Sequence, residues 1–379
     1  MFCYLDNAAT TRPYDEVIQY MMEVQEAIYG NPSSLHNFGV GAEKEMSKAR
    51  EIVAHSLNIS AKEIVFTSSA TEANNLAVRG FLNRNHRVGR HIITSEIEHP
   101  SILELCKDLE KNGYEIDRIK VEENGQIDMD HLRKLLRQDT ALVSVMYVNN
   151  ETGAIQPIEK IKKAIHEAES NAVLHVDAVQ GFAKHDFAPH KLGVDSATIS
   201  AHKFHGPKGA AALYIKSGIH IDPIIFGGGQ ERGLRSGTEN VPAIAGFAKA
   251  TEIAGASQND DLACVLQMRE TFLNGLEVEG LVINSDPNGS PYILNFAIPG
   301  IRSEVMLHHL ESVEVIVSTG SACASSRKSE SHVLRAMGKS RNVIDSSIRV
   351  SFGKRHTRQE IEYAVGHINA FSSSLRRKR

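Results

Sequence analysis

The feature that most constrains the fold of this chain is an alternation of short apolar runs, rich in β-branched residues, with longer amphipathic stretches. The alternation extends from about residue 15 to residue 254, and it is typical of a parallel sheet wrapped by helices. Amphipathic stretches such as 42–57, 100–112 and 157–168 are expected to be helices. Six apolar runs are expected to be strands: residues 63–67, 91–95, 142–148, 173–177, 196–200 and 211–215. The sequence therefore predicts an α/β fold.

Beyond residue 255 the pattern changes. Short apolar runs at 292–297 and 347–352 are mixed with helical stretches at 304–310 and 359–371, which is typical of an α+β arrangement. The chain has 379 residues, more than one hydrophobic core usually serves. We therefore expect a large domain of residues 15–254 and a small domain formed by residues 1–14 and 255–379.

The charge balance argues against several classes of partner. With 42 basic and 46 acidic side chains the formal net charge is −4, so no overall field attracts nucleic acid or an anionic membrane. The first residues lack a basic segment followed by an apolar one, and no apolar run reaches membrane-spanning length. We expect a soluble cytoplasmic protein without a direct nucleic-acid or membrane partner.

Four cysteines are too few and too scattered for a disulfide framework, and none belongs to a Cys-x-x-Cys pair. None of the 18 histidines has the spacing of a metal site, so no metal is expected. Cys323 differs from the other three cysteines because it lies among small polar residues with Arg327 and Lys328 close by. An accessible loop with basic neighbours favours the reactive thiolate.

Lys203 lies directly after an expected strand and before a Gly-Pro-x-Gly turn. Ligands of open α/β sheets bind where the carboxyl ends of the strands meet. A partly buried lysine in such a place can form a Schiff base with an aldehyde cofactor, which is the attachment that pyridoxal phosphate requires. A lone lysine at a strand end would be better explained as a surface residue, so other residues must support this interpretation.

Asp177 gives that support. It ends another expected strand, where its carboxylate can pair with a protonated pyridine nitrogen, and Gln180 can bond the ring oxygen. The small hydroxyl residues of 67–75 open a helix, where they form either a phosphate site or an ordinary helix cap. The glycine-dense segment 226–238 is a long irregular loop, which is usually functional in a compact domain.

Three further side chains have both a structural and a functional interpretation. His99 follows a strand and can stack on a planar ring or transfer protons, although a single histidine is more often structural. Asn150 can present its amide to a cofactor or form a turn. Arg349 lies in a short expected strand, where its planar group can hold a carboxylate or make a surface ion pair.

Taken together, these segments resemble the NifS/IscS-type cysteine desulfurases, a group of class V aminotransferases among the fold type I pyridoxal-phosphate enzymes. The likeness covers nearly the whole chain. It depends on residues 4–11, 30–34, 70–72, 149–151, 175–178, 200–209, 227–238 and 320–323. The resemblance implies the fold type I transferase architecture, with a mainly parallel seven-stranded sheet in the large domain and a smaller α+β C-terminal domain.

The resemblance also implies a homodimer and the roles of individual residues. Lys203, His99 and Cys323 would be catalytic, and Arg349 with Asn150 would bind the cysteine substrate. The residues implied to bind pyridoxal 5′-phosphate are Ala70, Thr71, His99, Asn150, Asp177, Gln180, Ser200, His202 and Lys203, joined by Thr238 of the partner subunit.

The implied reaction takes sulfur from L-cysteine, releases L-alanine and leaves a persulfide on Cys323. An acceptor protein, either an iron–sulfur scaffold or a tRNA-thiolating enzyme, would then take the sulfur. A selenocysteine lyase or another class V aminotransferase remains as an alternative, and Cys323 argues against a transaminase. A scaffold protein that kept the fold without catalysis is the other alternative, which the presence of Lys203, Asp177 and His99 disfavours.

Overall fold

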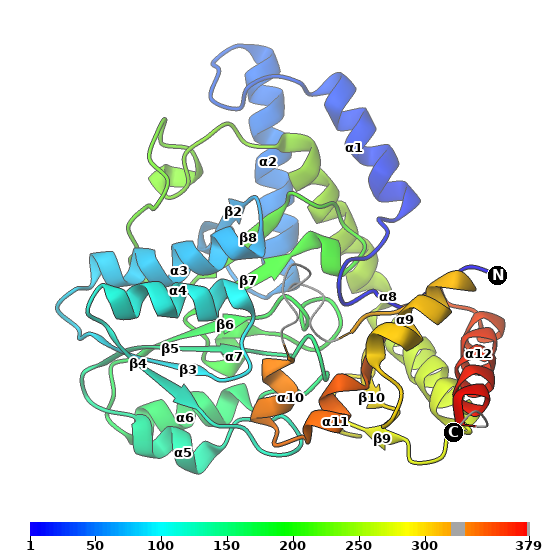
Figure 1. Ribbon diagram of the computed structural model, residues 1–379. Coiled ribbons are helices and arrows are strands. Elements are labelled where there is room, and N and C mark those ends of the chain that lie inside the picture. Colours follow the sequence, from blue (N-terminus) through cyan, green and yellow to red (C-terminus); the bar gives the residue numbers. More distant parts are fainter. Residues whose placement is uncertain (320–329, 377–379) are drawn as a thin grey trace.

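The computed structural model describes residues 1–319 and 330–376 of the chain. Its centre is a seven-stranded sheet in the order β2-β8-β7-β6-β5-β3-β4 (Figure 1). The strands are β2 (Ile64–Thr67), β3 (His91–Ser95), β4 (Glu115–Ile119), β5 (Thr140–Met146), β6 (Val173–Asp177), β7 (Ser196–Ser200) and β8 (Ala211–Ile215). The pairs from β7 to β4 are parallel, whereas β8 is antiparallel to both neighbours. The predicted α/β fold with a mainly parallel sheet is confirmed.

Helices cover both faces of this sheet. They are α1 (Asp15–Ala27), α2 (Asn37–Ser56), α3 (Ala70–Arg84), α4 (Pro100–Lys111), α5 (Met129–Leu135), α6 (Ile158–Glu167), α7 (Pro189–Leu192) and α8 (Val241–Gly275), with the 3-10 turns η1 (Ala61–Glu63), η2 (Ala201–Lys203) and η3 (Glu231–Gly233). Neighbouring strand residues point to opposite faces. Ile92 packs in the core under α3 and α4, whereas Ile93 packs with α2, α6 and α8. With both faces covered, every residue of the inner strands β5, β6 and β7 is buried.

The C-terminal part forms a second, three-stranded sheet in the order β12 (Ser347–Ser351), β10 (Ile293–Ala297) and β9 (Val282–Ile283). Beside it, β1 (Cys3–Tyr4) pairs with β11 (Val315–Ile316) in a separate two-stranded sheet. Its helices are α9 (Ser303–Ser312), α10 (His332–Ala336), α11 (Arg341–Asp345) and α12 (Arg358–Arg376). Figure 1 shows these yellow to red elements gathered on one side, with the N terminus among them.

Helix α8 belongs to both parts of the molecule. Phe247 near its start packs in the core of the large sheet, whereas Phe272 near its end packs with Phe296 and Phe352 in the second core. The predicted domain boundary after residue 254 falls inside this continuous helix, and the division into two domains stays a prediction. In the part of the chain that the structure describes, no helix combines the length and the apolar character needed to cross a membrane.

Candidate active site

A cavity of about 620 Å³ opens at the carboxyl ends of the parallel strands, which is the usual ligand site of such sheets. Most residues singled out from the sequence line it: Ala70, Thr71, His99, Asn150, Asp177, Gln180, Ser200, His202, Lys203 and Arg349. They lie far apart in the sequence and meet because the strands that carry them end at one edge of the sheet. His99 follows β3, Asn150 follows β5, Asp177 ends β6, and Lys203 follows β7 in η2.

The amine of Lys203 is held by the N-terminal segment. Its Nζ donates hydrogen bonds to the backbone oxygens of Ala8 at 2.7 Å and Ala9 at 2.8 Å. Gly206 lets the chain turn directly after η2, since a Cβ there would lie 2.7 Å from the Cβ of Ala201. The Gly-Pro turn therefore fixes the place from which Lys203 reaches the cavity.

Asp177 and His99 are joined by two residues that the sequence analysis did not identify. Asn74 of α3 donates to Asp177 Oδ2 and to Ser101 Oγ, both at 2.9 Å. Ser101 Oγ in turn lies 2.9 Å from Nδ1 of His99. Because Ser101 Oγ already accepts from Asn74, its own proton is directed to the imidazole. Asn74 is fully buried, and its position one turn into the helix that opens at Ala70 is the signal that could have identified it.

This network fixes the tautomer of His99. Nδ1 accepts from the backbone N–H of Ser101 at 3.1 Å as well as from the Ser101 hydroxyl, so it carries no proton. The proton of the neutral ring therefore lies on Nε2. Burial lowers the pKa of His99, and the nearby Lys203 lowers it further against the opposing effect of Asp177. At neutral pH the imidazole is a neutral group that donates from Nε2.

The start of α3 provides anion-binding groups at the edge of the cavity. Ser69 caps the helix by accepting from the Glu72 N–H at 3.2 Å, and Ala70 and Thr71 follow in the first turn. Glu72 is held by Arg235 at 2.7 Å and by Ser68. The first backbone N–H groups of a helix bind phosphate readily. Ser200 and His202 lie across the same cavity, and burial lowers the pKa of His202 to about 4.

Arg349 comes from β12 and brings the second sheet into the site. Its Nη2 lies 2.8 Å from a carboxylate oxygen of Asp6, and its Nη1 donates to the backbone oxygen of Asn150 at 2.9 Å. Its Nε is buried and has no hydrogen-bond partner among residues 1–319 and 330–376. A guanidinium held in place on one side, with a donor still available, is suited to a substrate carboxylate.

Two buried carboxyl groups that were not among the predicted site residues lie at the cavity, Glu151 in its lining and Glu98 behind it. Glu98 accepts from Ser95 Oγ at 2.5 Å and from the Met146 N–H at 2.9 Å, and burial raises its pKa to about 8. Glu151 accepts from Ser331 at 2.6 Å, and burial raises its pKa to about 7. Both groups are anchored by hydrogen bonds, and Glu98 is mainly a neutral acid at pH 7.

Two predicted site residues are not placed in this cavity. Thr238 is exposed and is not among the lining residues, whereas Cys323 lies outside the described residues. The chain on either side of that segment does reach the site. Ser318 exchanges backbone hydrogen bonds with Arg349, and Glu330 and Ser331 line the cavity.

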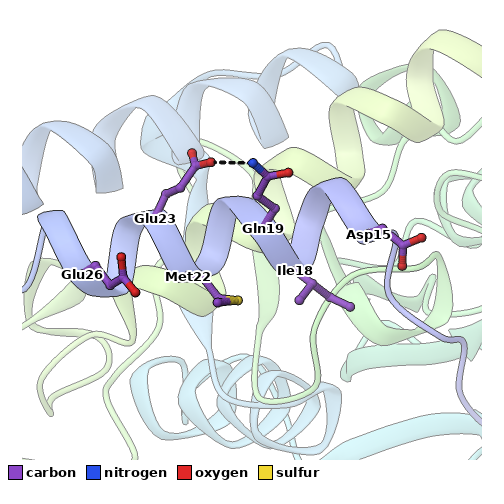
Figure 2. A pocket seen from close by; sticks show the side chains of 6 residues that line it. All are labelled: Asp15, Ile18, Gln19, Met22, Glu23 and Glu26. Carbon is purple, nitrogen blue, oxygen red and sulfur yellow. Dashed lines mark hydrogen bonds between the residues drawn. The ribbon is translucent and has the colours of Figure 1, made fainter.

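A second, shallower hollow lies along one side of α1 (Figure 2). It is lined by Asp15, Ile18, Gln19, Met22, Glu23 and Glu26. These six side chains include neither a nucleophile nor a cation, and Figure 2 shows them all on the one helix. The large cavity is therefore the candidate active site.

Comparison with known proteins identifies the family of the chain. The family model described as Aminotransferase class-V matches residues 3–364, and the chain belongs to this family. A curated relative, the cysteine desulfurase IscS of Dictyoglomus turgidum, is 40% identical over 98% of this chain and 95% of its own length. The putative cysteine desulfurase IscS 1 of Bacillus subtilis is 38% identical over 96% of this chain and 97% of its own.

Solved structures agree as well. A structure named NifS-like protein has a TM-score of 0.93 and 40% identity, and covers 98% of this chain and 100% of its own. SspA in complex with cysteine has a TM-score of 0.83 and 32% identity, and covers 94% of this chain and 100% of its own. The fold expected from the family is thus confirmed across nearly the whole chain.

Proposed function

We propose that this chain is a cysteine desulfurase, which takes sulfur from L-cysteine, releases L-alanine and holds the sulfur as a persulfide. The observation that carries the proposal is the meeting of an amine, a carboxylate and a guanidinium in one cavity: Lys203, Asp177 and Arg349. Full-length curated relatives bear the name cysteine desulfurase, and the similar SspA was solved in complex with cysteine.

The lining of the cavity fits pyridoxal 5′-phosphate as the cofactor. Lys203 supplies the amine for a Schiff base, Asp177 a carboxylate for the pyridine nitrogen, and Gln180 and Asn150 amides for the ring oxygen. The start of α3 with Thr71, together with Ser200 and His202, supplies donors for the phosphate. When bound, the cofactor supplies an electron-withdrawing ring that makes the substrate α carbon acidic.

Lys203 would have a second task when its amine is not bonded to the cofactor. Its Nζ would then be a base next to the substrate that takes the α proton and returns it. The backbone oxygens of Ala8 and Ala9 hold the amine in the site when it is not bonded to the cofactor. His99, with its proton on Nε2, would be the second proton-transfer group and would lie against the cofactor ring.

Arg349 and Asn150 bind the substrate. Asp6 and the Asn150 backbone oxygen hold the Nη2 and Nη1 groups of Arg349, and its Nε has no partner among the described residues. The guanidinium, held in this way at the cavity, would bind the substrate carboxylate. The arrangement accounts for an amino acid substrate without specifying the side chain, which must be recognised by the sulfur acceptor.

Cys323 is that acceptor. Its thiolate attacks the sulfur of the substrate, an S–S bond forms, and the C–S bond breaks. The electron pair of the broken bond goes to the substrate β carbon, which takes up a proton, so that alanine and a persulfide on Cys323 result. The two flanking segments that reach the cavity, at Ser318 and at Glu330, support this assignment.

The test is the release of alanine and sulfide from cysteine by cofactor-loaded protein. We expect equal amounts of both in the presence of a thiol reductant. Lys203→Ala should lose activity and the visible cofactor band, whereas Cys323→Ala should lose activity and keep the band. A fully active Cys323→Ala protein would instead favour the aminotransferase or selenocysteine lyase alternative, which a comparison of keto-acid formation and selenide release separates.

We further propose that the enzyme is a homodimer in which Thr238 reaches the cavity of the other subunit. Thr238 is exposed and absent from the cavity of its own chain, and large apolar side chains near α2 and in the same loop are exposed, with Leu35 at 99% and Phe226 at 82%. Apolar surface of this kind usually marks an interface. Light scattering should give twice the monomer mass, and Leu35→Asp should lower both the mass and the activity.

The persulfide would be passed to an acceptor protein, either an iron–sulfur scaffold or a tRNA-thiolating enzyme. Support for this step comes from the curated relatives named after IscS. Protein loaded with ³⁵S-labelled cysteine should transfer label to the true acceptor and not to a variant of that acceptor without its own sulfur-receiving cysteine.

A further inference from the structure

Lys184 is a buried cation that the proposed mechanism does not use. The residue is 8% exposed, and none of the ion pairs found among the described residues includes it. Its Nζ donates to Gln180 Oε1 at 3.2 Å and lies 5.6 Å from the centre of the Tyr292 ring. A lysine buried without a carboxylate is unfavourable, so a purely structural position would be better filled by an apolar residue.

The chain reaches Lys184 through a strained residue. Ala183 has a φ of 63°, in the left-handed region that side chains with a Cβ disfavour. The turn that carries it is closed by backbone hydrogen bonds from Lys184 and His185 to Gly181 O, at 3.1 and 2.9 Å. The fold thus holds the lysine in place at a cost both in charge burial and in backbone conformation.

The contact with Gln180 indicates why the fold holds Lys184 in this position. Gln180 lines the cavity, and its Nε2 donates to the Ala8 backbone oxygen at 2.9 Å, the same oxygen that accepts from Lys203. If the amide were flipped, its NH₂ group would face the N–H donors of Lys184, and its oxygen would face the Ala8 oxygen. Both hydrogen bonds would be lost, so Lys184 and Ala8 together allow one amide orientation.

We propose that Lys184 is a positioning residue that fixes the Gln180 amide from behind the cavity wall and so keeps an N–H donor directed at the ring oxygen of the cofactor. This inference rests on the proposed function. It assigns no contact between Lys184 and the cofactor, because Lys184 is not among the residues that line the cavity.

The protonation of Lys184 is consistent with this role. Burial, aided by the charge of Lys203, lowers its pKa to about 7, and both the ammonium and the neutral amine donate to Gln180. The other charged or titratable groups around it are His185, His202 and His205, whose pKa values Lys184 helps to lower to about 4, and the phenol of Tyr292. The neutral amine can also accept a hydrogen bond, so Lys184 enforces the amide orientation fully only as the ammonium, and above pH 7 the acceptor-only Ala8 oxygen maintains it.

The test compares Lys184→Met, Lys184→Arg and the exposed control Lys191→Met in cofactor-loaded enzyme. Loss of the directed donor should lower kcat of Lys184→Met about tenfold. It should also raise, by about one unit, the pH at which the cofactor band changes, because a donor to the ring oxygen favours the deprotonated form. Lys184→Arg, which keeps an N–H donor, should recover most of both effects, and Lys191→Met should show neither.

A double-mutant cycle decides whether Lys184 acts through Gln180. In a Gln180→Ala background, Lys184→Met should change kcat and the pH midpoint little further. An equal shift in both backgrounds would overturn the proposal, because the lysine would then act by its charge alone. A lowered thermal midpoint with an unmoved pH midpoint would also overturn it, because Lys184 would then be structural.

The cofactor band separates this proposal from the proposed function. Wild-type protein that shows the band but releases no alanine contradicts the desulfurase, while the absorbance readouts still decide the role of Lys184. If the wild type releases alanine and sulfide and the band of Lys184→Met titrates as in the wild type, the desulfurase stands and the positioning role fails.

Discussion

Single residues in this site are held in protonation states that they rarely have in water. Burial keeps Glu98 largely neutral, with its pKa raised to about 8, and keeps His175 neutral, with its pKa lowered to about 4. His175 is bonded to a group that matches its neutral state, since its Nε2 lies 3.1 Å from Asn74 Oδ1. Both partners of Glu98 donate to Oε1, and the buried Oε2 has no hydrogen-bond partner among residues 1–319 and 330–376. Because Glu98 and His175 are largely neutral, Lys203, Asp177 and Arg349 in the cavity lining are among the charges that a ligand meets directly.

The planar guanidinium of Arg349 predicts that the variant Arg349→Lys binds the substrate less tightly. A lysine keeps the charge but loses the planar pair of donors, so we expect KM for cysteine to rise about 30-fold, equivalent to about 2 kcal/mol. The cofactor band should be unchanged, because Arg349 is proposed to contact the substrate alone. Steady-state kinetics test this, with the exposed Arg341→Lys as the control. An unchanged KM would mean that the carboxylate is bound elsewhere.

The raised pKa of Glu98 predicts that Glu98→Gln becomes the more stable protein at alkaline pH. Folded Glu98 keeps a proton up to pH 8, whereas the unfolded side chain loses it near pH 4.5, so wild-type stability falls as the pH rises through this window. Glutamine keeps the acceptor for Ser95 and Met146 and cannot ionise. We expect its free energy of unfolding to exceed that of the wild type by on the order of 2 kcal/mol at pH 8.5.

Denaturant unfolding at pH 5 and pH 8.5 checks the sign of this effect. At pH 5 wild-type Glu98 is protonated in the folded state and the two proteins should differ little. A difference of the same size at both pH values would show that the amide acts through packing and not through the proton.

The sequence identifies the residues that directly follow strands but not those that support them. Lys203 and Asp177 are predictable because a strand end in a parallel sheet is a defined location. For Asn74 the sequence offers only its position one turn into α3, and the roles of Ser101 and Lys184 depend on burial and on tertiary contacts, which a local pattern does not encode. The role of Thr238 depends on a second chain and therefore stays a prediction.

At the scale of elements, Gly246 and Gly255 of α8 have opposite expected effects when they are replaced by alanine. Gly255 is exposed, and a Cβ built there meets nothing within 4 Å, whereas at Gly246 it would lie 2.6 Å from the Met21 side chain of α1 and 3.3 Å from Pro207. Gly255→Ala should therefore stabilise the protein by about 0.5–1 kcal/mol through helix propensity. Gly246→Ala should destabilise it by about 1–3 kcal/mol through overpacking.

Thermal or denaturant unfolding of the two variants side by side tests this pair, because both add the same methyl group to the same helix. Stabilisation by Gly246→Ala would show that α1 moves away from α8 without loss. Destabilisation by Gly255→Ala would show that this face of the helix is covered in the assembled protein.

The elements of the large sheet are predictable to different degrees. Each of the six predicted strands matches a strand to within two residues at either end, because strands buried on both faces appear as short runs rich in apolar residues. β4 was not predicted, since Glu115, Asp117 and Arg118 make this edge strand polar. It is recognisable only from its parallel pairing with β3. An edge strand with charges is protected against pairing with other chains.

At the scale of the whole molecule, the active site is formed where distant parts of the chain meet. The N-terminal segment supplies Ala8 and Asp6, the large sheet supplies Lys203, and the second sheet supplies Arg349. Asp6 bonds Arg349 at 2.8 Å while Ala8 bonds Lys203 at 2.7 Å. The first residues of the chain thus connect the proposed cofactor lysine with the proposed substrate arginine, and a displacement of either sheet would disturb both.

Burial of histidine side chains makes the free energy of unfolding of the whole molecule decrease at acid pH. Burial, as the main cause, lowers the pKa values of four histidines to about 4: His175, His185, His202 and His205. In the unfolded chain these groups bind a proton near pH 6.5, so between pH 6.5 and pH 4 the unfolded state binds more protons and stability falls as the pH falls. Glu98 and Glu151 oppose this trend, but the four imidazoles outnumber them.

His205→Gln should reduce the loss of stability that occurs as the pH falls from 6.5 to 4. The ring of His205 stacks on Tyr14 at 4.5 Å, and its Nδ1 lies 2.8 Å from the Arg12 backbone oxygen, outside the cavity lining. Glutamine can keep that hydrogen bond and takes up no proton, so the loss of stability between pH 6.5 and pH 4.5 should shrink by on the order of 1 kcal/mol. Unfolding of cofactor-loaded wild type and variant at both pH values measures the difference. If His205→Gln lowers stability equally at pH 6.5 and pH 4.5, the ring contributes packing alone, and the loss of stability at acid pH has another origin.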